Sequence, residues 1–378
     1  MDNTLMENEY MLRAIELAKK GAGAVNPNPL VGAVIVKDGR IIGEGYHARF
    51  GDLHAERNAI KNAKERGEDM RGAEIYVTLE PCCHHGHQPP CTEAVVEAGI
   101  KKVYVGSDDP NPLVAGKGLQ FLNEHGVETV THVMKEECDA LNDVFFHYIT
   151  QKTPYIVYKY AMTMDGKIAT YTGNSKYVSG PDSLEKVHEM RNLYTGIMVG
   201  MGTLLADDPE LTCRLDGGGR NPVRIIVDSY LSIPEDSKIV KTAKEIRTIL
   251  LTTEPDQASL VWSDWVHRQK ELEELGLEII IVSEDKGKMD WQDAMEKLGQ
   301  AGIDGILLEG GGRLAWQLLE NHLIDEVHAF VAPKMIGGKM AISPVDGQGF
   351  AQMDLAEVFT LTGLERHNQD VELIYKKN

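Results

Sequence analysis

The sequence predicts a protein of two α/β domains. Its 378 residues exceed one domain of ordinary size, since domains of about 100–200 residues are the norm. Short apolar runs of strand length alternate along the chain with segments that have the apolar period of amphipathic helices, a pattern typical of α/β folds. A polar link interrupts this alternation near residues 148–154 and ends in Pro154, which disfavours helix in the residue before it. We therefore place one domain at residues 1–150 and the other at residues 151–378.

The first domain begins with a helix and a β-hairpin. Apolar residues recur at helical spacing from Met11 to Ala18, and Gly21 and Gly23 end that helix. Asp38-Gly39 joins two strand-like runs, and Asp-Gly is a strong signal for a hairpin turn. Helices and strands then alternate, which predicts a sheet covered on both faces. The expected elements are strands 31–36 and 41–45, helix 54–63, strand 75–79, helix 91–98, strand 103–105, helix 118–124, strand 127–130 and a helix that ends with residues 144–149.

The second domain has the pattern of a mostly parallel sheet with an added C-terminal segment. It opens with strand 155–162, and helix 183–194 follows a polar, turn-rich stretch. The runs 223–228, 248–251 and 278–282 are each apolar enough to be central strands. The remaining expected elements are strand 197–199, helix 291–301, strand 306–308, helix 314–319 and strand 326–331.

Composition excludes several classes of protein. Apolar residues make up 42% and charged residues 26% of the chain, which excludes a disordered or collagen-like protein. The net charge of −19 repels phosphate backbones, so we expect no nucleic-acid partner, although a local basic pocket can still bind a small phosphorylated substrate. No apolar run approaches the ~18–20 residues of a membrane span, and the polar, acidic start is no signal peptide. We expect a cytoplasmic protein without a membrane partner.

The cysteines point to a metal. Three of the five, Cys82, Cys83 and Cys91, lie close together in the sequence, which in a cytosolic protein indicates a metal site rather than a disulfide framework. His54-Ala55-Glu56 matches the H-x-E element of zinc-dependent nucleobase deaminases. His54, Cys82 and Cys91 would supply three ligands for Zn²⁺ and leave one coordination position open, as in catalytic zinc sites.

Glu56 is the candidate catalytic residue. It lies two residues after His54 in one helical turn, so it can reach a water at the metal without being a ligand. There it would take the proton of that water and pass it to the leaving ammonia, while the metal lowers the water's pKa. We expect Cys82 and Cys91 at or near helix starts, where the helix dipole favours thiolate.

The spacing of the two cysteines departs from the general deaminase signature. Eight residues separate them instead of two, and they offer Cys83, His84, His85 and His87 as rival ligands. Cys83 is disfavoured because adjacent residues rarely point at one ion from a strand end. The three histidines remain open as groups around the metal or the substrate. A closed structural zinc site is the alternative, but such sites usually take four ligands in paired spacings.

Three consecutive glycines, Gly310-Gly311-Gly312, lie between a predicted strand and a predicted helix. Backbone amides at such a point can approach a phosphate without interference from Cβ atoms, and a helix N-terminus favours an anion. The stretch is not the G-x-G-x-x-G fingerprint of dinucleotide-binding folds. By itself it is equally consistent with a plain tight turn.

Further motifs specify a family. The sequence contains, beside the H-x-E element, Asn26-Pro27-Asn28-Pro29-Leu30-Val31-Gly32, Glu80-Pro81-Cys82, Pro89-Pro90-Cys91, Asp109-Pro110-Asn111-Pro112, Met164-Asp165-Gly166-Lys167 and Ala206-Asp207-Asp208-Pro209. Together with Glu309 and the glycines they resemble the bifunctional riboflavin-biosynthesis deaminase/reductases over nearly the whole chain. The long cysteine spacing is similar to this family's variant of the motif.

The resemblance implies a cytidine-deaminase-like α/β/α domain at the N-terminus. Its substrate would be a 2,5-diamino-6-ribosylamino-pyrimidinone 5′-phosphate, which loses its 2-amino group as ammonia. Asn28 and His47 match positions that hold the pyrimidine, and Asp109 and Asn111 match a loop at the ribose-phosphate end. Many members of the family have lysine before Pro-Pro-Cys, where His87 stands here, so that phosphate contact would be weaker at neutral pH.

The resemblance also implies a dihydrofolate-reductase-like domain that uses NADPH at the C-terminus. Hydride transfer would convert the ribosyl group into a ribitylamino side chain. Arg191 and Arg214 suit a guanidinium clamp for the 5′-phosphate, and Asp165 is as consistent with a structural turn as with catalysis. The implied substrate contacts are Ser175, Arg191, Leu211, Arg214 and Glu309. The implied NADPH contacts are Ala161, Tyr177, Thr203, Asp207, Gly311, Gly312, Arg313, Leu314, Ala315, Trp316 and Gln317.

The main hypothesis is therefore a bifunctional enzyme, which the resemblance implies to be a homo-oligomer. One alternative is a deaminase of nucleic acid or free cytosine, against which the acidic charge and the whole second domain argue. The other alternative is a protein that binds zinc and a nucleotide, with only one active half or none. The sequence reveals no obvious proton donor for the reductase.

Overall fold

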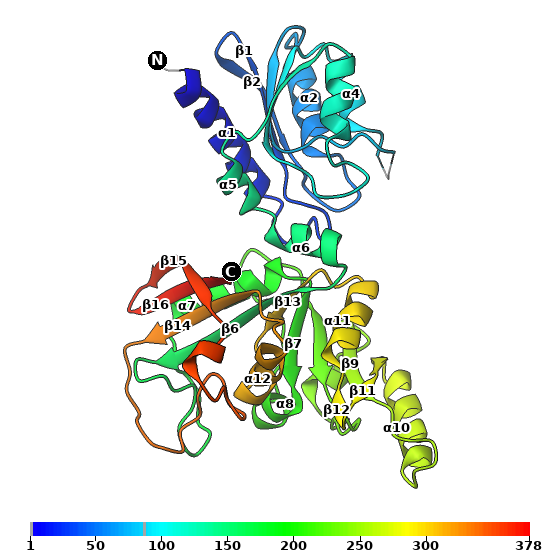
Figure 1. Ribbon diagram of the computed structural model, residues 1–378, viewed down its shortest axis with the longest axis vertical. Coiled ribbons are helices and arrows are strands. Elements are labelled where there is room, and N and C mark those ends of the chain that lie inside the picture. Colours follow the sequence, from blue (N-terminus) through cyan, green and yellow to red (C-terminus); the bar gives the residue numbers. More distant parts are fainter. Residues whose placement is uncertain (1–2, 86–87) are drawn as a thin grey trace. The chain divides into compact units, whose positions relative to one another are not determined.

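The computed structural model describes residues 3–85 and 88–378 (Figure 1). The chain divides into two compact units, one that ends at Lys152 and one that spans Thr153–Asn378. Each unit has its own central sheet. No helix in the described part of the chain combines the length and the apolar character that a membrane span requires.

The sheet of the first unit has five strands in the order β2-β1-β3-β4-β5. The hairpin of β1 and β2 pairs antiparallel with β3, while β3, β4 and β5 run parallel. The carboxyl ends of β3 and β4 therefore lie side by side at one edge, which is where this unit's site is built. The strands are β1 (Gly32–Lys37), β2 (Arg40–Tyr46), β3 (Glu74–Leu79), β4 (Lys102–Ser107) and β5 (Glu128–Val130).

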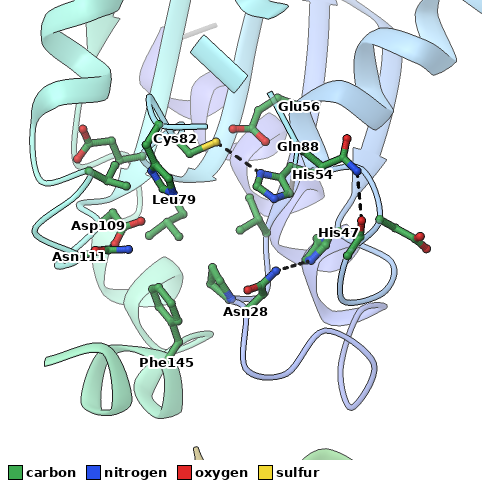
Figure 2. Close-up of a pocket in the computed structure, with 17 residues that line it drawn as sticks. Asn28, His47, His54, Glu56, Leu79, Cys82, Gln88, Asp109, Asn111 and Phe145 are labelled. Atoms are coloured by element: carbon green, nitrogen blue, oxygen red, sulfur yellow. Dashed lines mark hydrogen bonds between the residues drawn. The ribbon is translucent and has the colours of Figure 1, made fainter. Parts of the chain in front are cut away.

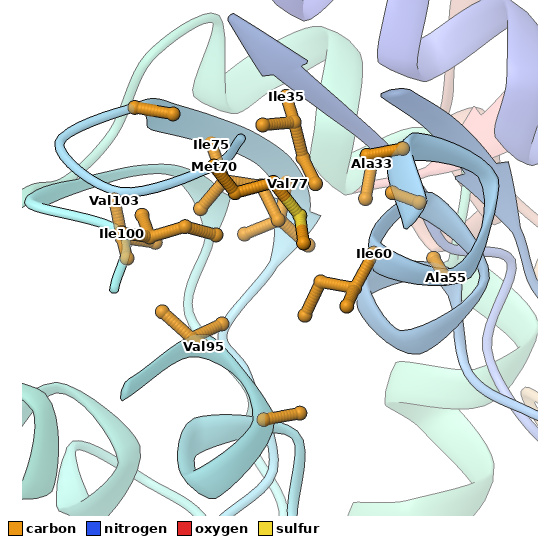
Figure 3. Packing of buried hydrophobic residues seen from close by; sticks show 14 of the residues in the cluster. Ala33, Ile35, Ala55, Ile60, Met70, Ile75, Val77, Val95, Ile100 and Val103 are labelled. Atoms are coloured by element: carbon orange, nitrogen blue, oxygen red, sulfur yellow. The ribbon is translucent and has the colours of Figure 1, made fainter. Parts of the chain in front are cut away.

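Helices cover both faces of this sheet, as the sequence predicts. On one face Ile35, Ile75 and Val77 pack against Ile60 of α2 and Val95 of α3 (Figure 3). On the other face Met11 and Ile15 of α1 pack against the sheet. The helices are α1 (Asn3–Lys19), α2 (Ala55–Glu65), α3 (Cys91–Glu97), α4 (Lys117–Glu124), α5 (Lys135–Asp139) and α6 (Asp143–Gln151).

The second unit contains a nine-stranded sheet in the order β10-β9-β8-β7-β13-β6-β14-β16-β15. In this order, all strands from β10 at one edge through β14 run parallel to one another. Strands β16 and β15 then add an antiparallel hairpin at the other edge. This is the predicted mostly parallel sheet with a C-terminal addition. The strands are β6 (Tyr155–Thr163), β7 (Gly196–Gly200), β8 (Val223–Val227), β9 (Thr248–Thr253), β10 (Glu278–Val282), β13 (Gly305–Leu308), β14 (Glu326–Ala332), β15 (Phe359–His367) and β16 (Asp370–Lys377).

Two apolar clusters bury the faces of this second sheet. One contains the apolar sides of α11 and α12, and the other contains those of α8, α9 and α10. A small ribbon of β11 (Glu284–Asp285) and β12 (Lys288–Met289) lies outside the main sheet. The helices are α7 (Pro181–Leu193), α8 (Met201–Asp207), α9 (Lys238–Lys241), α10 (Trp262–Glu274), α11 (Trp291–Gln300) and α12 (Gly312–Glu320), with a 3₁₀ turn at Met353–Leu355.

Residues 278–282 form the predicted strand, although it is not a central strand of the sheet. They form β10, which is the edge strand of the sheet. Ile279 and Ile281 pack into one apolar cluster and Ile280 into the other. The apolar run therefore reflects helices on both faces of the strand, which an edge strand of a doubly covered sheet has in common with a central strand.

Candidate active sites

Three predicted metal ligands meet in the first unit. His54 is the residue before α2, Cys82 lies in the loop after β3, and Cys91 is the first residue of α3. The Nδ1 atom of His54 lies 3.5 Å from Sγ of Cys82 and 3.4 Å from Sγ of Cys91. A tetrahedral zinc ion with ordinary bond lengths separates its nitrogen and sulfur ligands by about 3.6 Å. The three side chains therefore fit Zn²⁺ in spacing as well as in chemistry.

The loop position of Cys82 corrects the expectation that both cysteines lie at helix starts. Cys91 begins α3, but Cys82 follows the end of β3 and accepts a hydrogen bond from the backbone N–H of Cys91 at 3.4 Å. Hydrogen bonds from the Cys91 thiol and from His54 lower the pKa of Cys82 to about 4. Cys82 is thus held as thiolate by its neighbours rather than by a helix of its own, and thiolate is the form that binds a metal.

Glu56 lies directly beside this cluster, in the first turn of α2. Its side chain is only 3% exposed, and burial, together with the nearby Cys82 thiolate, raises its pKa. Figure 2 shows its carboxylate above His54 and Cys82, at the inner end of the cavity. A buried carboxyl group with a raised pKa next to an open metal site is suited to accept and return a proton.

A cavity of about 210 Å³ opens in front of the cluster. Asn28 and His47 lie on one side of it, where Nδ2 of Asn28 and Nε2 of His47 are 3.2 Å apart. Burial lowers the pKa of His47, so the ring is held neutral. Asp109 and Asn111 lie opposite, in the loop after β4 (Figure 2). Asp109 accepts a hydrogen bond from the Asn111 N–H, and burial raises its pKa to about 6.

The rival ligands are arranged differently. The Cys83 thiol is directed to the backbone oxygen of Leu113, 3.8 Å away. His84 lines the cavity, but it is not in the group of side chains within ligand distance of one another. His85 is exposed, and His87 lies outside the described residues. Among the described residues of this loop, only Cys82 and Cys91 thus share the metal position with His54.

In the second unit, the predicted cofactor residues gather at the carboxyl ends of the parallel strands. The backbone N–H of Gly311, at the end of β13, donates to Oγ1 of Thr203 on α8 at 3.1 Å. At the far end of α8, Asp207 lies 3.8 Å from the ammonium of Lys176, which ties the loop of Ser175 and Tyr177 to this edge. Ala161 lies near the end of β6 in the same sheet.

The residues after Gly311 fall into two groups. A Cβ atom on Gly312 would lie 2.8 Å from the backbone nitrogen of Asp346, so this glycine is required by close packing. Leu314, Ala315 and Trp316 are buried in the fold, which leaves only their backbone for a cofactor. Arg313 is exposed and Gln317 lines a second cavity. Leu211 is likewise buried.

Arg191 and Glu309 form a bidentate ion pair that the sequence does not predict. Nε and Nη2 of Arg191 lie 2.7 and 2.9 Å from the two carboxylate oxygens of Glu309, and Nη1 donates to the backbone oxygen of Thr212. One of the two arginines of the expected phosphate clamp, Arg191, is therefore already paired with Glu309. Arg214 is exposed and contacts Thr212 and Glu210.

Lys159 is a candidate that the sequence reasoning missed. It lies on β6 opposite the end of β13, where Tyr158 pairs with Leu308, the residue before Glu309. Burial lowers its pKa, although the charge of Glu309 acts in the opposite direction. An isolated lysine in a strand carries no sequence signal; only the pairing of β6 with β13 reveals its neighbours. Asp165, by contrast, accepts hydrogen bonds from Oγ1 of Thr163 in its own turn and from the backbone N–H of Gly337 in the segment after β14.

Comparison with known proteins assigns a class to each unit. Residues 6–107 match the cytidine and deoxycytidylate deaminase zinc-binding region, and residues 154–371 match the RibD C-terminal domain. The molecule is thus a zinc-dependent deaminase joined to a reductase. The zinc-binding region and the RibD reductase domain make Zn²⁺ and NADPH its cofactors.

The chain belongs to the RibD family of bifunctional riboflavin-biosynthesis enzymes. It is 48% identical to the riboflavin biosynthesis protein RibD of Actinobacillus pleuropneumoniae, over 98% of this chain and 96% of that protein. It is 37% identical to RibD of Bacillus amyloliquefaciens, over 97% of this chain and 95% of that protein. A crystal structure of a diaminohydroxyphosphoribosylaminopyrimidine deaminase/5-amino-6-(5-phosphoribosylamino)uracil reductase from Thermotoga maritima superposes with a TM-score of 0.86 at 39% identity, covering both chains fully. Members of this family have both a deaminase and a reductase domain, and both are matched here. The bifunctional hypothesis is therefore supported over its alternatives.

Proposed function

We propose that residues 1–150 deaminate 2,5-diamino-6-ribosylamino-4(3H)-pyrimidinone 5′-phosphate and that residues 151–378 reduce the product with NADPH. The final product would be 5-amino-6-ribitylaminouracil 5′-phosphate. The observation that carries the proposal is the meeting of His54, Cys82 and Cys91 beside buried Glu56, at the inner end of a cavity of about 210 Å³. The relatives' substrates and the division of the chain at Lys152 support the same assignment.

In the deaminase, His54, Cys82 and Cys91 would hold the zinc ion. When bound, Zn²⁺ supplies Lewis acidity that makes water a nucleophile near neutral pH. Glu56 would take a proton from the attacking water on a carboxylate oxygen and deliver it to the departing amino group, so that water enters and ammonia leaves. Asn28 and neutral His47 would hold the pyrimidine by hydrogen bonds, and Asp109 and Asn111 would contact the ribose-phosphate end.

In the reductase, the residues at the strand ends fit a dinucleotide. The space beside the Cα of Gly311 is open, because a Cβ atom there would meet only Oγ1 of Thr203, at 3.5 Å, so a cofactor phosphate can approach this backbone. NADPH, when bound, supplies the hydride. Thr203, Asp207, Ala161, Tyr177 and the segment 311–317 would hold it. Because Leu314, Ala315 and Trp316 are buried, they would act through their backbone.

The substrate of the reductase would lie beside Arg191 and Glu309. Glu309 would bind polar groups of the substrate, while Arg191 fixes the orientation of the Glu309 carboxylate. Arg214, with Ser175 and the backbone of Leu211, would contact the phosphate of the substrate. We propose Lys159 as the proton donor for the ring oxygen that is released when the ribosyl carbon accepts the hydride. Its half-buried position, near Glu309, and its lowered pKa support this role.

We further propose that the enzyme is a cytoplasmic homo-oligomer that binds neither nucleic acid nor membrane. The net charge of −19 supports the absence of a nucleic-acid partner. All five cysteines are free, which is consistent with a reducing compartment. Strand β15 is the outermost strand of its sheet and exposes Leu361 and Leu364 by 52% and 65%, and such an edge favours association. Light scattering on the purified protein measures the mass of the assembly.

The two activities can be tested separately. Glu56→Gln should lower ammonia release by about 10²- to 10⁴-fold and leave bound zinc, measured by atomic emission, unchanged. The same variant should still reduce substrate that has already been deaminated. A matched control is Glu93→Gln, which changes an acidic residue in the first turn of α3 outside the cavity and should leave both rates unchanged. Loss of both activities in Glu56→Gln would contradict the assignment of one activity to each unit.

A further inference from the structure

The long loop between Cys82 and Cys91 needs an anchor that lies outside it. Eight residues separate the two cysteines, whereas two separate them in the general deaminase signature. With two residues, a single turn of the chain fixes one cysteine relative to the other. Here the distance between the two sulfur atoms depends on what holds the last residues before Cys91, because that cysteine starts α3.

The segment directly before Cys91 consists of Pro89 and Pro90. Neither proline has a backbone N–H, so their backbone can be anchored by hydrogen bonds only through its carbonyl oxygens. The first N–H groups of α3 are directed to Cys82. That of Cys91 donates to Sγ of Cys82 at 3.4 Å, and that of Thr92 donates to its backbone oxygen at 3.2 Å. The position of Cys82 therefore follows the position of the start of α3.

Arg57 of α2 holds the carbonyl oxygens of both prolines. Its Nε donates to the backbone oxygen of Pro89 at 3.1 Å, and its Nη2 donates to that of Pro90 at 2.8 Å. The nitrogens of a guanidinium group lie in one rigid plane. Two contacts from this plane fix the direction of the segment as well as its distance from α2.

The helix that carries Arg57 also places the other groups of the site. His54 is the residue before α2, and Glu56 lies in its first turn. This end of the helix is fastened to the sheet, because Nδ2 of Asn58 donates to the backbone oxygen of Tyr46 at the end of β2. Arg57 thus connects a fixed helix, which places the histidine ligand and the catalytic carboxylate, with the helix start that places the two cysteines.

We infer that Arg57 is a positioning residue of the zinc site, which keeps Cys82 and Cys91 at the spacing from His54 that Zn²⁺ requires. Arg57 does not line the cavity in front of the metal position; it lines a surface groove between α2 and α3. It therefore acts through the two carbonyl oxygens and not on the substrate. The inference rests on the zinc site of the proposed function and adds to it a residue that is neither ligand nor catalytic.

Measurements of zinc binding test the inference without relying on turnover. Arg57→Met keeps much of the arginine stem and removes both hydrogen bonds. It should weaken zinc binding by about 10- to 100-fold, the range for residues that orient metal ligands, in competition with a chromogenic chelator. With Co²⁺ in place of zinc, its visible absorption spectrum should change, because the arrangement of the two thiolates around the metal changes. Reduction of pre-deaminated substrate by NADPH should stay the same and serves as the internal control.

Two further variants separate positioning from general stability. Arg57→Lys should recover part of the zinc affinity, since an ammonium group can still donate to a carbonyl oxygen. Lys61→Met is the matched control, because Lys61 follows one turn later on α2, lines the same groove and lies 3.9 Å from Glu65; its zinc affinity should stay unchanged. In calorimetry of Arg57→Met, the deaminase transition should fall further in the zinc-loaded protein than in the metal-free protein, because weaker zinc binding lowers the stability that zinc adds.

Three results would overturn the inference. Unchanged zinc affinity and an unchanged Co²⁺ spectrum in Arg57→Met would mean that the cysteines keep their places without the arginine. An equal loss in Lys61→Met would locate the effect in the groove. An equal fall of the zinc-loaded and metal-free transitions, with no recovery in Arg57→Lys, would mean that Arg57 only stabilises the fold. In each case the unaltered protein still binds one zinc ion per chain, so the proposed function stands. If the unaltered protein binds well below one, the proposed function itself fails.

Discussion

The ion pair of Arg191 and Glu309 leads to a quantitative prediction. Their side chains are only 13% and 12% exposed, so replacing one partner leaves the other charge without compensation in a poorly hydrated site. We choose Arg191→Met, because methionine keeps much of the volume of the arginine stem while it removes all three hydrogen-bonding contacts of the guanidinium.

The expected loss follows from the pKa of Glu309. Burial alone would raise this pKa, but the charge and hydrogen bonds of Arg191, with Lys159 beyond them, lower it from 4.5 to about 2. At about 1.4 kcal/mol per pH unit, the environment stabilises the ionised carboxylate by about 3 kcal/mol. Arg191→Met should therefore destabilise the reductase unit by about 3–5 kcal/mol at neutral pH, the range for a broken buried pair.

Differential scanning calorimetry of the zinc-loaded protein measures the effect. The transition of the reductase unit should move down by about 6–20 °C, at roughly 2–4 °C per kcal/mol for a unit of this size, and the deaminase transition should stay in place. Arg214→Met is the matched control, since its side chain is 54% exposed and surface ion pairs contribute about 0–1 kcal/mol.

The dependence of this stability loss on pH tests whether the ionised Glu309 carboxylate causes it. A depressed pKa contributes stability above pH 4.5, and this contribution disappears as the pH falls toward 2. The difference between the unaltered protein and Arg191→Met should therefore shrink below about pH 4. The double variant Arg191→Met/Glu309→Gln should be more stable than Arg191→Met, because no charge is left unpaired. Strictly additive effects of the two substitutions would refute the coupling.

Three further predictions concern other buried groups. Cys91→Ser should reduce bound zinc to well below one ion per chain and abolish ammonia release, while NADPH binding persists; retention of full zinc would contradict the ligand assignment. Burial raises the pKa of Asp325 to about 7, so the reductase unit loses stability as the pH rises from about 4 to 7; Asp325→Asn should stabilise it more at pH 8 than at pH 5, and an equal effect at both would exclude this cause. Glu80 accepts hydrogen bonds from the N–H groups of Gly116 and Gly118 and thus fixes the loop before α4, so Glu80→Ala should raise the KM of deamination more than it lowers kcat; a change in kcat alone would contradict a positioning role.

Most of the fold is predictable because the strands of doubly covered sheets are apolar and short. Two of the elements that escape prediction lack this signal. Helix α5 is five residues of mainly charged sequence, and β15 has exposed residues at most of its positions, so neither has a period from which it could be recognised. The edge position of β10 depends on pairing between distant segments, and composition does not report pairing.

The deaminase site is predictable to a greater extent than the reductase site, for a physical reason. Zinc ligands come from a few residue types at restricted spacings, and His54, Cys82 and Cys91 meet as their spacing indicates. Reductase contacts have no such restriction, since backbone and ordinary polar groups suffice. The ion pair of Arg191 with Glu309 and the place of Lys159 opposite the end of β13 appear only when α7, β6 and β13 are brought together.

The central claim is that one chain performs both steps on one substrate. The most direct test supplies the zinc-loaded protein with the diaminopyrimidine ribosyl phosphate and NADPH, and follows ammonia release and NADPH absorbance together until the substrate is consumed. The account predicts one ammonia and one oxidised NADPH per substrate, and Glu56→Gln should abolish the ammonia while the pre-deaminated compound still consumes NADPH. Ammonia without NADPH oxidation would contradict the assignment of the second unit, and the absence of both from a zinc-replete protein would contradict the account as a whole.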